Sequence, residues 1–224
     1  MTIGFRILTR ARKVDAATIK RFRTLPVANV SDSMSRMVAA GPRLRAMQRG
    51  GAMAGPALTV KVRPGDNLMI HKALDIAAKG DIVVVDGGGD LTNALIGELM
   101  SAHALKRGIG GIVINGAIRD SGAIRAGRLP VYAAGVTHRG PYKDGPGEIN
   151  VTVALDGMVI EPGDLILGDD DGIVCVPYDL CAEVFSAASA KHKAEDQQML
   201  EIRAGRSNRA WVDLCLKKLG CEGL

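Results

Sequence analysis

Apolar and polar positions along the chain follow two regular patterns, one typical of buried strands and one typical of amphipathic helices. Consecutive, mostly β-branched apolar residues occur at positions 82–85 and 112–114, as in strands that are covered on both faces. Residues 67–78 and 91–106 instead have apolar positions at helical spacing. A further apolar run begins at 129–133. This βαβαβ order predicts a layered α/β fold.

Shorter patterns flank this centre. Helices are expected at 17–25 and 30–39, with Asn29 or Ser31 as the N-cap of the second one. Short strands between turn residues are expected at 57–62, 149–155, 158–160, 165–167 and 173–176. Residues 178–219 have a helical pattern that is interrupted at 205–208. We therefore predict one domain over residues 1–224, with an N-terminal helical region (1–50), an α/β core (51–177) and C-terminal helices (178–224).

The composition excludes one class of partner. Hydrophobic residues make up 47% of the 224 residues, but aromatic residues only 3%, whereas there are 28 glycines. Binding single-stranded nucleic acid by base stacking needs an aromatic platform, and the few aromatic residues are scattered. The net charge is +5, from 29 Lys and Arg against 24 Asp and Glu. We assign the excess of basic residues to solvent-exposed faces of helices and expect no nucleic-acid partner. An anionic small substrate is also compatible with the positive charge.

The four cysteines and the N-terminus indicate the compartment. Cysteine spacing matches neither a zinc site nor a redox motif, so we expect free thiols in a reducing environment. Arginines interrupt the N-terminal segment, which therefore lacks the apolar region of a signal peptide. No apolar run approaches the roughly 20 residues that span a bilayer. We expect a cytoplasmic protein with no membrane partner.

Candidate chemistry lies where the buried strands end, because ligands of α/β sheets gather at the carboxyl ends of strands. The glycine-rich segment 87–90 fits neither nucleotide-binding fingerprint, and a tight turn explains it. Arg119 and Asp120 follow the next strand. The arginine offers a fork for a carboxylate or enolate oxygen, and the aspartate offers a hard ligand for Mg²⁺ or Mn²⁺. An N-cap aspartate beside a surface arginine is the alternative, and the residues alone slightly favour it.

A second candidate is the segment 97–100. If Gly97 opens a helical turn, the free amides of 97–100 form an anion site. Glu98 has apolar neighbours, so its carboxylate is either paired or suited to proton transfer; an exposed glutamate on an amphipathic helix is the plainer and favoured alternative. His71 follows Asn67 by one helical turn and could face the same pocket.

These two candidates together resemble a known family. Gly97-Glu98-Leu99-Met100, followed after twenty residues by Arg119-Asp120, is similar to the D/E-x20-R-D motif of the RraA-like family. The similarity is strongest to its 4-hydroxy-4-methyl-2-oxoglutarate/4-carboxy-4-hydroxy-2-oxoadipate (HMG/CHA) aldolases. It covers most of the chain and includes residues 64–71, 110–120, 161–164 and 169–174.

The resemblance implies a fold and an activity. The fold is a layered α/β/α arrangement, similar to swivelling phosphohistidine domains, here with a helical C-terminal extension. The activity is that of a class II pyruvate aldolase using Mg²⁺ or Mn²⁺, which cleaves HMG or CHA to pyruvate and an oxo acid. Because decarboxylation of oxaloacetate passes through the same pyruvate enolate, it is implied as a side activity. A homotrimer or homohexamer with sites at subunit interfaces is also implied.

The resemblance also assigns roles to residues at the reacting centre. Asp120 would hold the metal, and Arg119 would contact the substrate and stabilise the enolate. Glu98 would order a metal-linked water for proton transfer, and Glu195 would come from a neighbouring subunit.

Substrate binding is assigned by the same resemblance. The small anionic 2-oxo acid would be bound by the segment Gly97–Met100, through the amides of Leu99 and Met100. Asn67 and His71 would lie near the distal end of the substrate.

Two further functions remain open from the sequence. Some family members bind and inhibit ribonuclease E without catalysis, but that branch can lack the aspartate after the arginine, so Asp120 favours the enzyme. A lyase acting on another 2-oxo acid is the other alternative. The sequence departs from the family at Asn115, where aspartate is common, and in the divergent segment 206–224.

Overall fold

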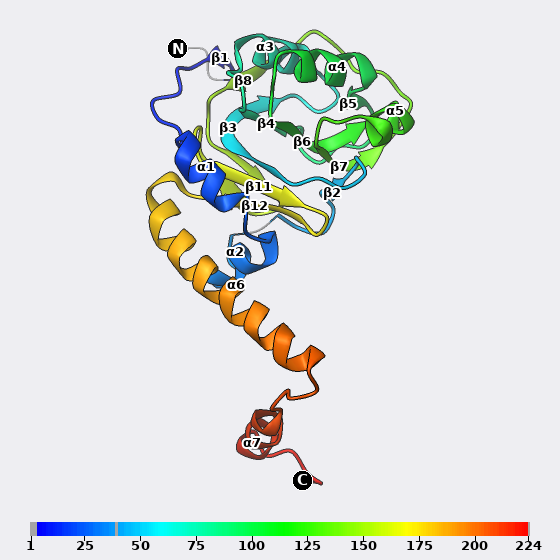
Figure 1. Ribbon diagram of the computed structural model, residues 1–224. Coiled ribbons are helices and arrows are strands. Elements are labelled where there is room, and N and C mark those ends of the chain that lie inside the picture. Colours follow the sequence, from blue (N-terminus) through cyan, green and yellow to red (C-terminus); the bar gives the residue numbers. More distant parts are fainter. Residues whose placement is uncertain (1–3, 39, 224) are drawn as a thin grey trace.

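A mixed sheet of ten strands forms the centre of the computed structural model, which describes residues 4–38 and 40–223 (Figure 1). Ten strands belong to this sheet: β1 (Phe5–Ile7), β2 (Arg45–Ala46), β3 (Met53–Val62), β4 (Ile82–Asp86), β5 (Ala94–Ile96), β6 (Gly111–Ile118), β7 (Val131–Val136), β8 (Gly147–Ile149), β11 (Leu165–Asp169) and β12 (Gly172–Val176). Strands β9 (Val153–Leu155) and β10 (Met158–Ile160) form a separate antiparallel pair. The helices are α1 (Ala16–Phe22), α2 (Val27–Ser33), α3 (Leu68–Ile76), α4 (Glu98–Lys106), α5 (Ser121–Ala126), a 3₁₀ turn η1 (Tyr178–Leu180), α6 (Cys181–Arg203) and α7 (Ala210–Lys218).

The main path of the sheet is β1-β8-β3-β4-β6-β7-β2, with β3, β4, β6 and β7 parallel to one another. The short strand β5 pairs in parallel with the carboxyl end of β6. Strand β3 belongs to two pairings, because its first residues pair with β11 and its later residues pair with β4 and β8. The loops that follow β5 and β6 therefore leave the sheet side by side.

Two apolar layers cover the faces of the sheet. Along β4, Val83 and Val85 pack toward α3 and α4, whereas Ile82 and Val84 pack toward β9, β10 and the β11–β12 pair. Helices α1, α2 and α6 then pack on β11 and β12. Figure 1 shows α3, α4 and α5 on one side of the sheet and α1, α2 and α6 beyond the other. The layered α/β fold is confirmed, with strands contributing to the second layer.

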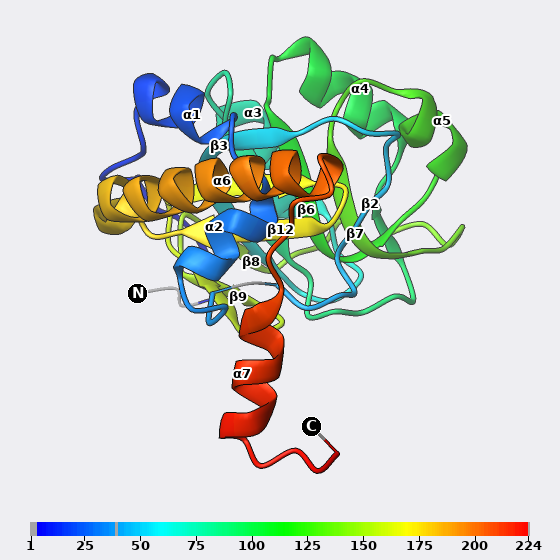
Figure 2. The same ribbon diagram turned by 60° about the horizontal axis from the view of Figure 1, so that its bottom comes forward.

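The C-terminal helices project from this body. Helix α6 buries Cys181, Val184 and Ala188 in its first half, and the break after it lies where the sequence predicts it. The later part of α6 and all of α7 extend away from the sheet (Figures 1 and 2). In the described part of the chain, no helix combines the length and apolarity needed to cross a bilayer.

The second N-terminal helix begins and ends earlier than expected. Helix α2 has Pro26 at its N-cap position, so neither Asn29 nor Ser31 caps it. The carboxylate of Asp169 accepts the N–H of Val27 at 2.9 Å and thereby caps α2 from another element. The helix ends at Ser33 because the following turn places Ser35 and Arg36 at positive φ. Ala39, the expected end, lies outside the described residues.

The helix expected over 91–106 was wrong in its first part. Ala94–Ile96 form β5, since Ala94 and Ile96 pair with Ala117 and Ile118 of β6. Gly97 has an extended backbone, and α4 begins only at Glu98. The strand expected at 149–155 is likewise divided into β8 and β9, with Asn150 at a positive φ between them. In the first case pairing with β6 overrides the helical pattern, and in the second the two parts pair differently, β8 with β1 and β3, and β9 with β10.

Candidate functional site

The β5–α4 turn and the β6–α5 turn meet at one edge of the sheet. The N–H of Arg119 donates to the carbonyl of Ile96 at 3.0 Å, which extends the β5–β6 pairing to the ends of both strands. Arg119 and Asp120 therefore lie against Gly97 and Glu98, although twenty residues separate them in sequence. The parallel pairing thus accounts for the spacing of the motif.

Asp120 is fixed by α4 and does not cap α5. It occupies the N-cap position of α5 in a left-handed conformation, with φ 54°, but makes no side-chain capping bond there. Instead its Oδ2 accepts the backbone N–H of Glu98 at 3.0 Å and lies 3.7 Å from Nε of Arg119. The alternative of an N-cap aspartate therefore holds for its position but not for its side chain, which binds the first turn of α4 and not that of α5. The side chains of Arg119 and Asp120 are 44% and 42% exposed, so both can reach a ligand.

Gly97 provides the space that this arrangement needs. A β-carbon at Gly97 would overlap Oδ2 of Asp120 and lie 2.9 Å from Cγ of Arg119. The backbone of Gly97 is extended, with φ −151°, so the requirement is steric and not conformational. Any side chain at this position would displace the carboxylate from the first turn of α4.

A cavity of about 160 Å³ opens at this pair. It brings together seven of the residues expected from the sequence: Asn67, His71, Gly97, Leu99, Met100, Arg119 and Asp120. Leu99 and Met100 have apolar side chains, and their amides lie in the first turn of α4, where N–H groups lack intrahelical acceptors and can bind an anion.

His71 lies in α3, and Asn67 occupies the N-cap position of that helix. The buried side chain of Asn67 donates through Nδ2 to the carbonyl of Leu95 at 2.8 Å, which ties α3 to β5. Its Oδ1 is buried without a hydrogen-bond partner among the described residues. The pKa of His71 is lowered from its ordinary value, first by desolvation and then by the charge of Lys143, while Asp75 opposes the shift. His71 is therefore a neutral imidazole near pH 7.

Lys143 is a residue of this cavity that the sequence analysis missed. It lies in the loop before β8, far in sequence from the motif, and no local pattern distinguishes it from other exposed lysines. Only the return of this loop to the start of α3 brings it to the cavity. With Arg119 it gives the cavity two permanent cations against the single carboxylate of Asp120, which favours an anionic ligand.

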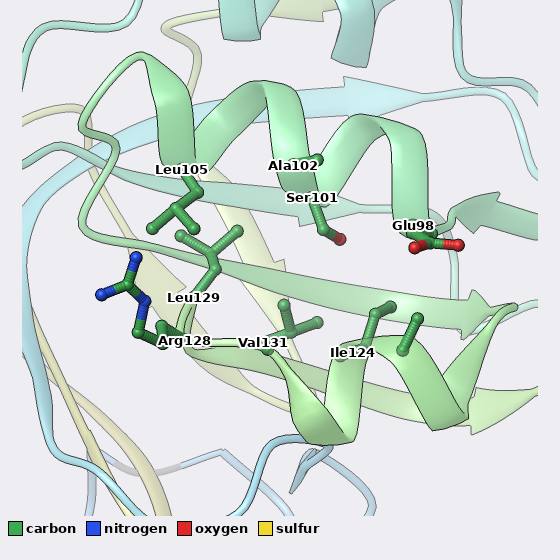
Figure 3. A pocket seen from close by; sticks show the side chains of 10 residues that line it. Glu98, Ser101, Ala102, Leu105, Ile124, Arg128, Leu129 and Val131 are labelled. Carbon is green, nitrogen blue, oxygen red and sulfur yellow. The ribbon is translucent and has the colours of Figure 1, made fainter.

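The backbone N–H of Glu98 donates to Asp120, but the Glu98 side chain lines a different cavity. That second cavity, of about 170 Å³, lies between α4 and the α5–β7 segment. Figure 3 shows apolar side chains such as Leu105, Leu129 and Val131 facing one another across it, with Glu98 at one end and Arg128 at the other. Glu98 therefore contacts Asp120 through its backbone N–H, while its carboxylate lines the second cavity.

Glu195 does not line the Asp120 cavity of its own chain. Its Oε2 accepts Nδ2 of Asn29 at 2.6 Å, and its Oε1 lies 3.2 Å from Nζ of Lys191. The hydrogen bond from Asn29 and then that from Lys191 lower the pKa of Glu195. Within one chain this carboxylate belongs to the contact between α2 and α6.

Comparison with known proteins identifies the family. The family model RraA-like, described as Aldolase/RraA, matches residues 27–175. The chain belongs to the RraA-like family. The matched range contains every expected site residue except Glu195, which lies beyond it.

Relatives in the RraA-like family include two bacterial proteins with the name "Putative 4-hydroxy-4-methyl-2-oxoglutarate aldolase". The protein from Halalkalibacterium halodurans is 37% identical over 179 residues, covering 80% of this chain and 85% of the relative. The protein from Cupriavidus necator is 38% identical over 145 residues, covering 65% of this chain and 86% of the relative.

Solved structures share the RraA-like fold. A crystal structure of an uncharacterized protein from Pseudomonas syringae pv. tomato has a TM-score of 0.78 at 26% identity, covering 86% of this chain and 95% of that one. The RNA-processing inhibitor RraA from Thermus thermophilis has a TM-score of 0.63 at 29% identity, covering 68% and 92%. The fold expected from the resemblance is therefore confirmed.

We expect His71 to titrate below its ordinary pKa of 6.5 when followed by NMR. Lys143→Met should raise this midpoint, because it removes a cation that disfavours the imidazolium form. Lys72→Met, on the same helix as His71, is the matched control and should leave it in place. A midpoint at or above 6.5, or no response to Lys143→Met, would contradict the geometry of the cavity.

Proposed function

We propose that this protein is a divalent-metal-dependent pyruvate aldolase. Its substrate would be a 4-hydroxy-2-oxo dicarboxylic or tricarboxylic acid of the HMG or CHA type, and oxaloacetate decarboxylation would be a side activity. The observation that carries the proposal is the Asp120 carboxylate, held by the Glu98 amide beside Arg119 at a cavity with a second cation. The names of the two relatives support the same reaction class.

The donor set fits Mg²⁺ or Mn²⁺ held mainly by water. Among residues 4–38 and 40–223, no three or more His, Cys, Asp or Glu side chains are grouped closely enough to hold a metal ion. Mg²⁺ retains several waters and commonly takes only one or two protein carboxylates. Asp120 offers such a carboxylate, with one oxygen engaged by the Glu98 amide and 42% of the side chain exposed. When bound, the ion supplies Lewis acidity toward the 2-oxo group.

The chain's own residues would bind and orient the 2-oxo acid. The amides of Leu99 and Met100 lie in the first turn of α4, where N–H groups lack intrahelical acceptors, and would bind the carboxylate next to the 2-oxo group. The Arg119 guanidinium would stabilise the negative charge that develops on the 2-oxo oxygen. Lys143, His71 and Asn67 line the remainder of the cavity and would meet the distal carboxylate.

In the cleavage, the bond between C3 and C4 breaks. The 4-hydroxyl group loses its proton and C4 becomes a carbonyl, while the bonding electrons pass to the pyruvate enolate, which is later protonated at C3. We propose that Glu195 of a neighbouring subunit orders the water for these proton transfers. Glu98, which the family resemblance gives the same role, lines the other cavity of this chain and supplies its backbone N–H to Asp120. Loss of CO₂ from oxaloacetate leaves the same enolate, so one site serves both reactions.

A shared site requires a homo-oligomer, which we propose to be a trimer or a hexamer. Glu195 lies on the part of α6 whose following turns expose Met199, Leu200 and Ile202 at 46–56%. This apolar surface supports contact with a second copy, because exposed apolar clusters favour association. A non-catalytic regulator is the second candidate, favoured by the similarity to the Thermus protein named as an RNA-processing inhibitor.

The direct test is pyruvate release from HMG and from oxaloacetate. We expect release with Mg²⁺, and loss of it with EDTA or in Asp120→Asn. Arg119→Met should lower kcat by about 10²–10³-fold, as removal of an oxyanion donor does. Arg125→Met, which removes an exposed cation from α5, is the control and should retain activity. Release of no pyruvate from either substrate with any divalent metal would rule out this aldolase and leave the regulator or a lyase for another 2-oxo acid.

If one active site uses residues of two subunits, two inactive variants should complement each other. Glu195→Gln and Asp120→Asn should each be inactive alone, but co-expression should restore activity, because some mixed interfaces then have both native residues. Glu183→Gln, an exposed glutamate on the same helix, should be active without a partner. The melting temperature of each variant shows whether activity is lost at the site or because the α2–α6 contact is weakened, since only the second lowers the melting temperature. A fully active Glu195→Gln protein, or a mixture as inactive as its components, would refute the shared site.

A further inference from the structure

Asp66 is a fully buried carboxylate beside the candidate site, and it has no part in the proposed reaction. It ends the turn between β3 and α3. Its oxygens accept the backbone N–H groups of Asp144 at 2.7 Å, Gly145 at 2.9 Å and Leu68 at 3.0 Å, and Nη2 of Arg63 at 3.2 Å. A buried charge is costly unless it is satisfied by such donors, so this carboxylate fixes the segments that supply them.

Two of these donors belong to the loop that carries Lys143. Two backbone hydrogen bonds join the same segments: the N–H of Tyr142 donates to the carbonyl of Gly65 at 2.8 Å, and the N–H of Asn67 donates to the carbonyl of Tyr142 at 3.0 Å. The residues on both sides of Lys143 are therefore tied to the start of α3. The backbone of Lys143 cannot shift relative to α3 without breaking these bonds.

The start of α3 is in turn connected to the segment that contacts Arg119 and Asp120. Asn67, next to Asp66, donates to the carbonyl of Leu95 in β5, and β5 leads directly into Gly97. Asp66 thus lies at the junction of the loop with Lys143, the helix with Asn67 and His71, and the strand before Gly97. It does not line the cavity, so any effect on a ligand is transmitted through these segments.

We propose that Asp66 is a positioning residue that holds Lys143 where it meets the distal carboxylate of a 2-oxo acid. The inference deepens the proposed function and rests on it. Through the amides of Asp144 and Gly145, Asp66 fixes the distance between the Lys143 cation and the Arg119–Asp120 pair before a ligand arrives. It thereby sets selectivity for acids with a second carboxylate over pyruvate itself.

The test compares two ligands that differ in the distal carboxylate. Calorimetry on the Mg²⁺-loaded full chain measures Kd for 2-oxoglutarate, which has a second carboxylate, and for pyruvate, which lacks it. We expect Asp66→Asn to weaken 2-oxoglutarate binding about tenfold, within the range of a lost charge-assisted contact, and to leave pyruvate binding unchanged. Asp144→Asn removes a 75% exposed carboxylate from the same loop and is the matched control; it should change neither Kd.

A double-mutant cycle separates positioning from a merely structural role. If Asp66 acts through Lys143, then Asp66→Asn has no further effect on 2-oxoglutarate binding in a Lys143→Met background. Additive losses, or equal weakening of both ligands by Asp66→Asn, would overturn the inference. Because the cycle measures binding, it is distinct from the proposed aldolase reaction, which fails instead if the unaltered protein binds both acids but releases no pyruvate from HMG.

Hydrogen exchange of the ligand-free, unaltered protein tests the same tether without a variant, in case Asp66→Asn does not fold. The amides of Asp144 and Gly145 should exchange slowly, because both donate to a buried carboxylate. Rapid exchange at both amides would show that the loop is not held before binding and would overturn the inference.

Discussion

The hydrogen bond from the Glu98 amide to the Asp120 carboxylate is the contact on which the site depends. It joins the first turn of α4 to the turn after β6 and directs a carboxylate toward the cavity beside Arg119. The contact forms only because β5 and β6 end side by side and because Gly97 has no side chain. One sheet pairing and one missing β-carbon therefore place a hard oxygen ligand, a guanidinium and free helix amides around a small volume.

The rest of the cavity is assembled by a separate set of constraints. Helix α3 is tied to β5 through Asn67, and the loop with Lys143 is tied to α3 through Asp66. These bonds place a second cation, Lys143, in the cavity that Arg119 and Asp120 line. The resulting electrostatics, two cations and one carboxylate, suit an acid with charges at both ends. The apolar cavity between α4 and α5 contributes to none of these contacts.

The sequence predicts those features that depend on local patterns. Strands β4 and β6 were predicted because a strand buried on both faces is apolar throughout, as Ile82–Val85 are. Strand β5 was missed, since three residues next to a helical pattern become a strand only by pairing with β6. Lys143 was missed for the same kind of reason: its position follows from long-range bonds to Gly65 and Asp66. Arg119, Asp120 and the segment 97–100 were candidates from the local pattern, and the family resemblance joined them into one motif, whereas the role of Gly97 in leaving space for Asp120 emerges only in three dimensions.

We propose that Asp120 and Arg119, with the space left by Gly97, stabilise a pyruvate enolate. The most direct measurement is the exchange of pyruvate methyl protons with deuterium in D₂O, followed by NMR, because exchange requires the enolate but no aldol cleavage. We expect Mg²⁺-dependent exchange in the unaltered protein, its loss in Gly97→Ala, and its retention in Gly122→Ala, where a β-carbon meets open space. Pyruvate that binds without exchange, or equal exchange in Gly97→Ala, would contradict the proposal.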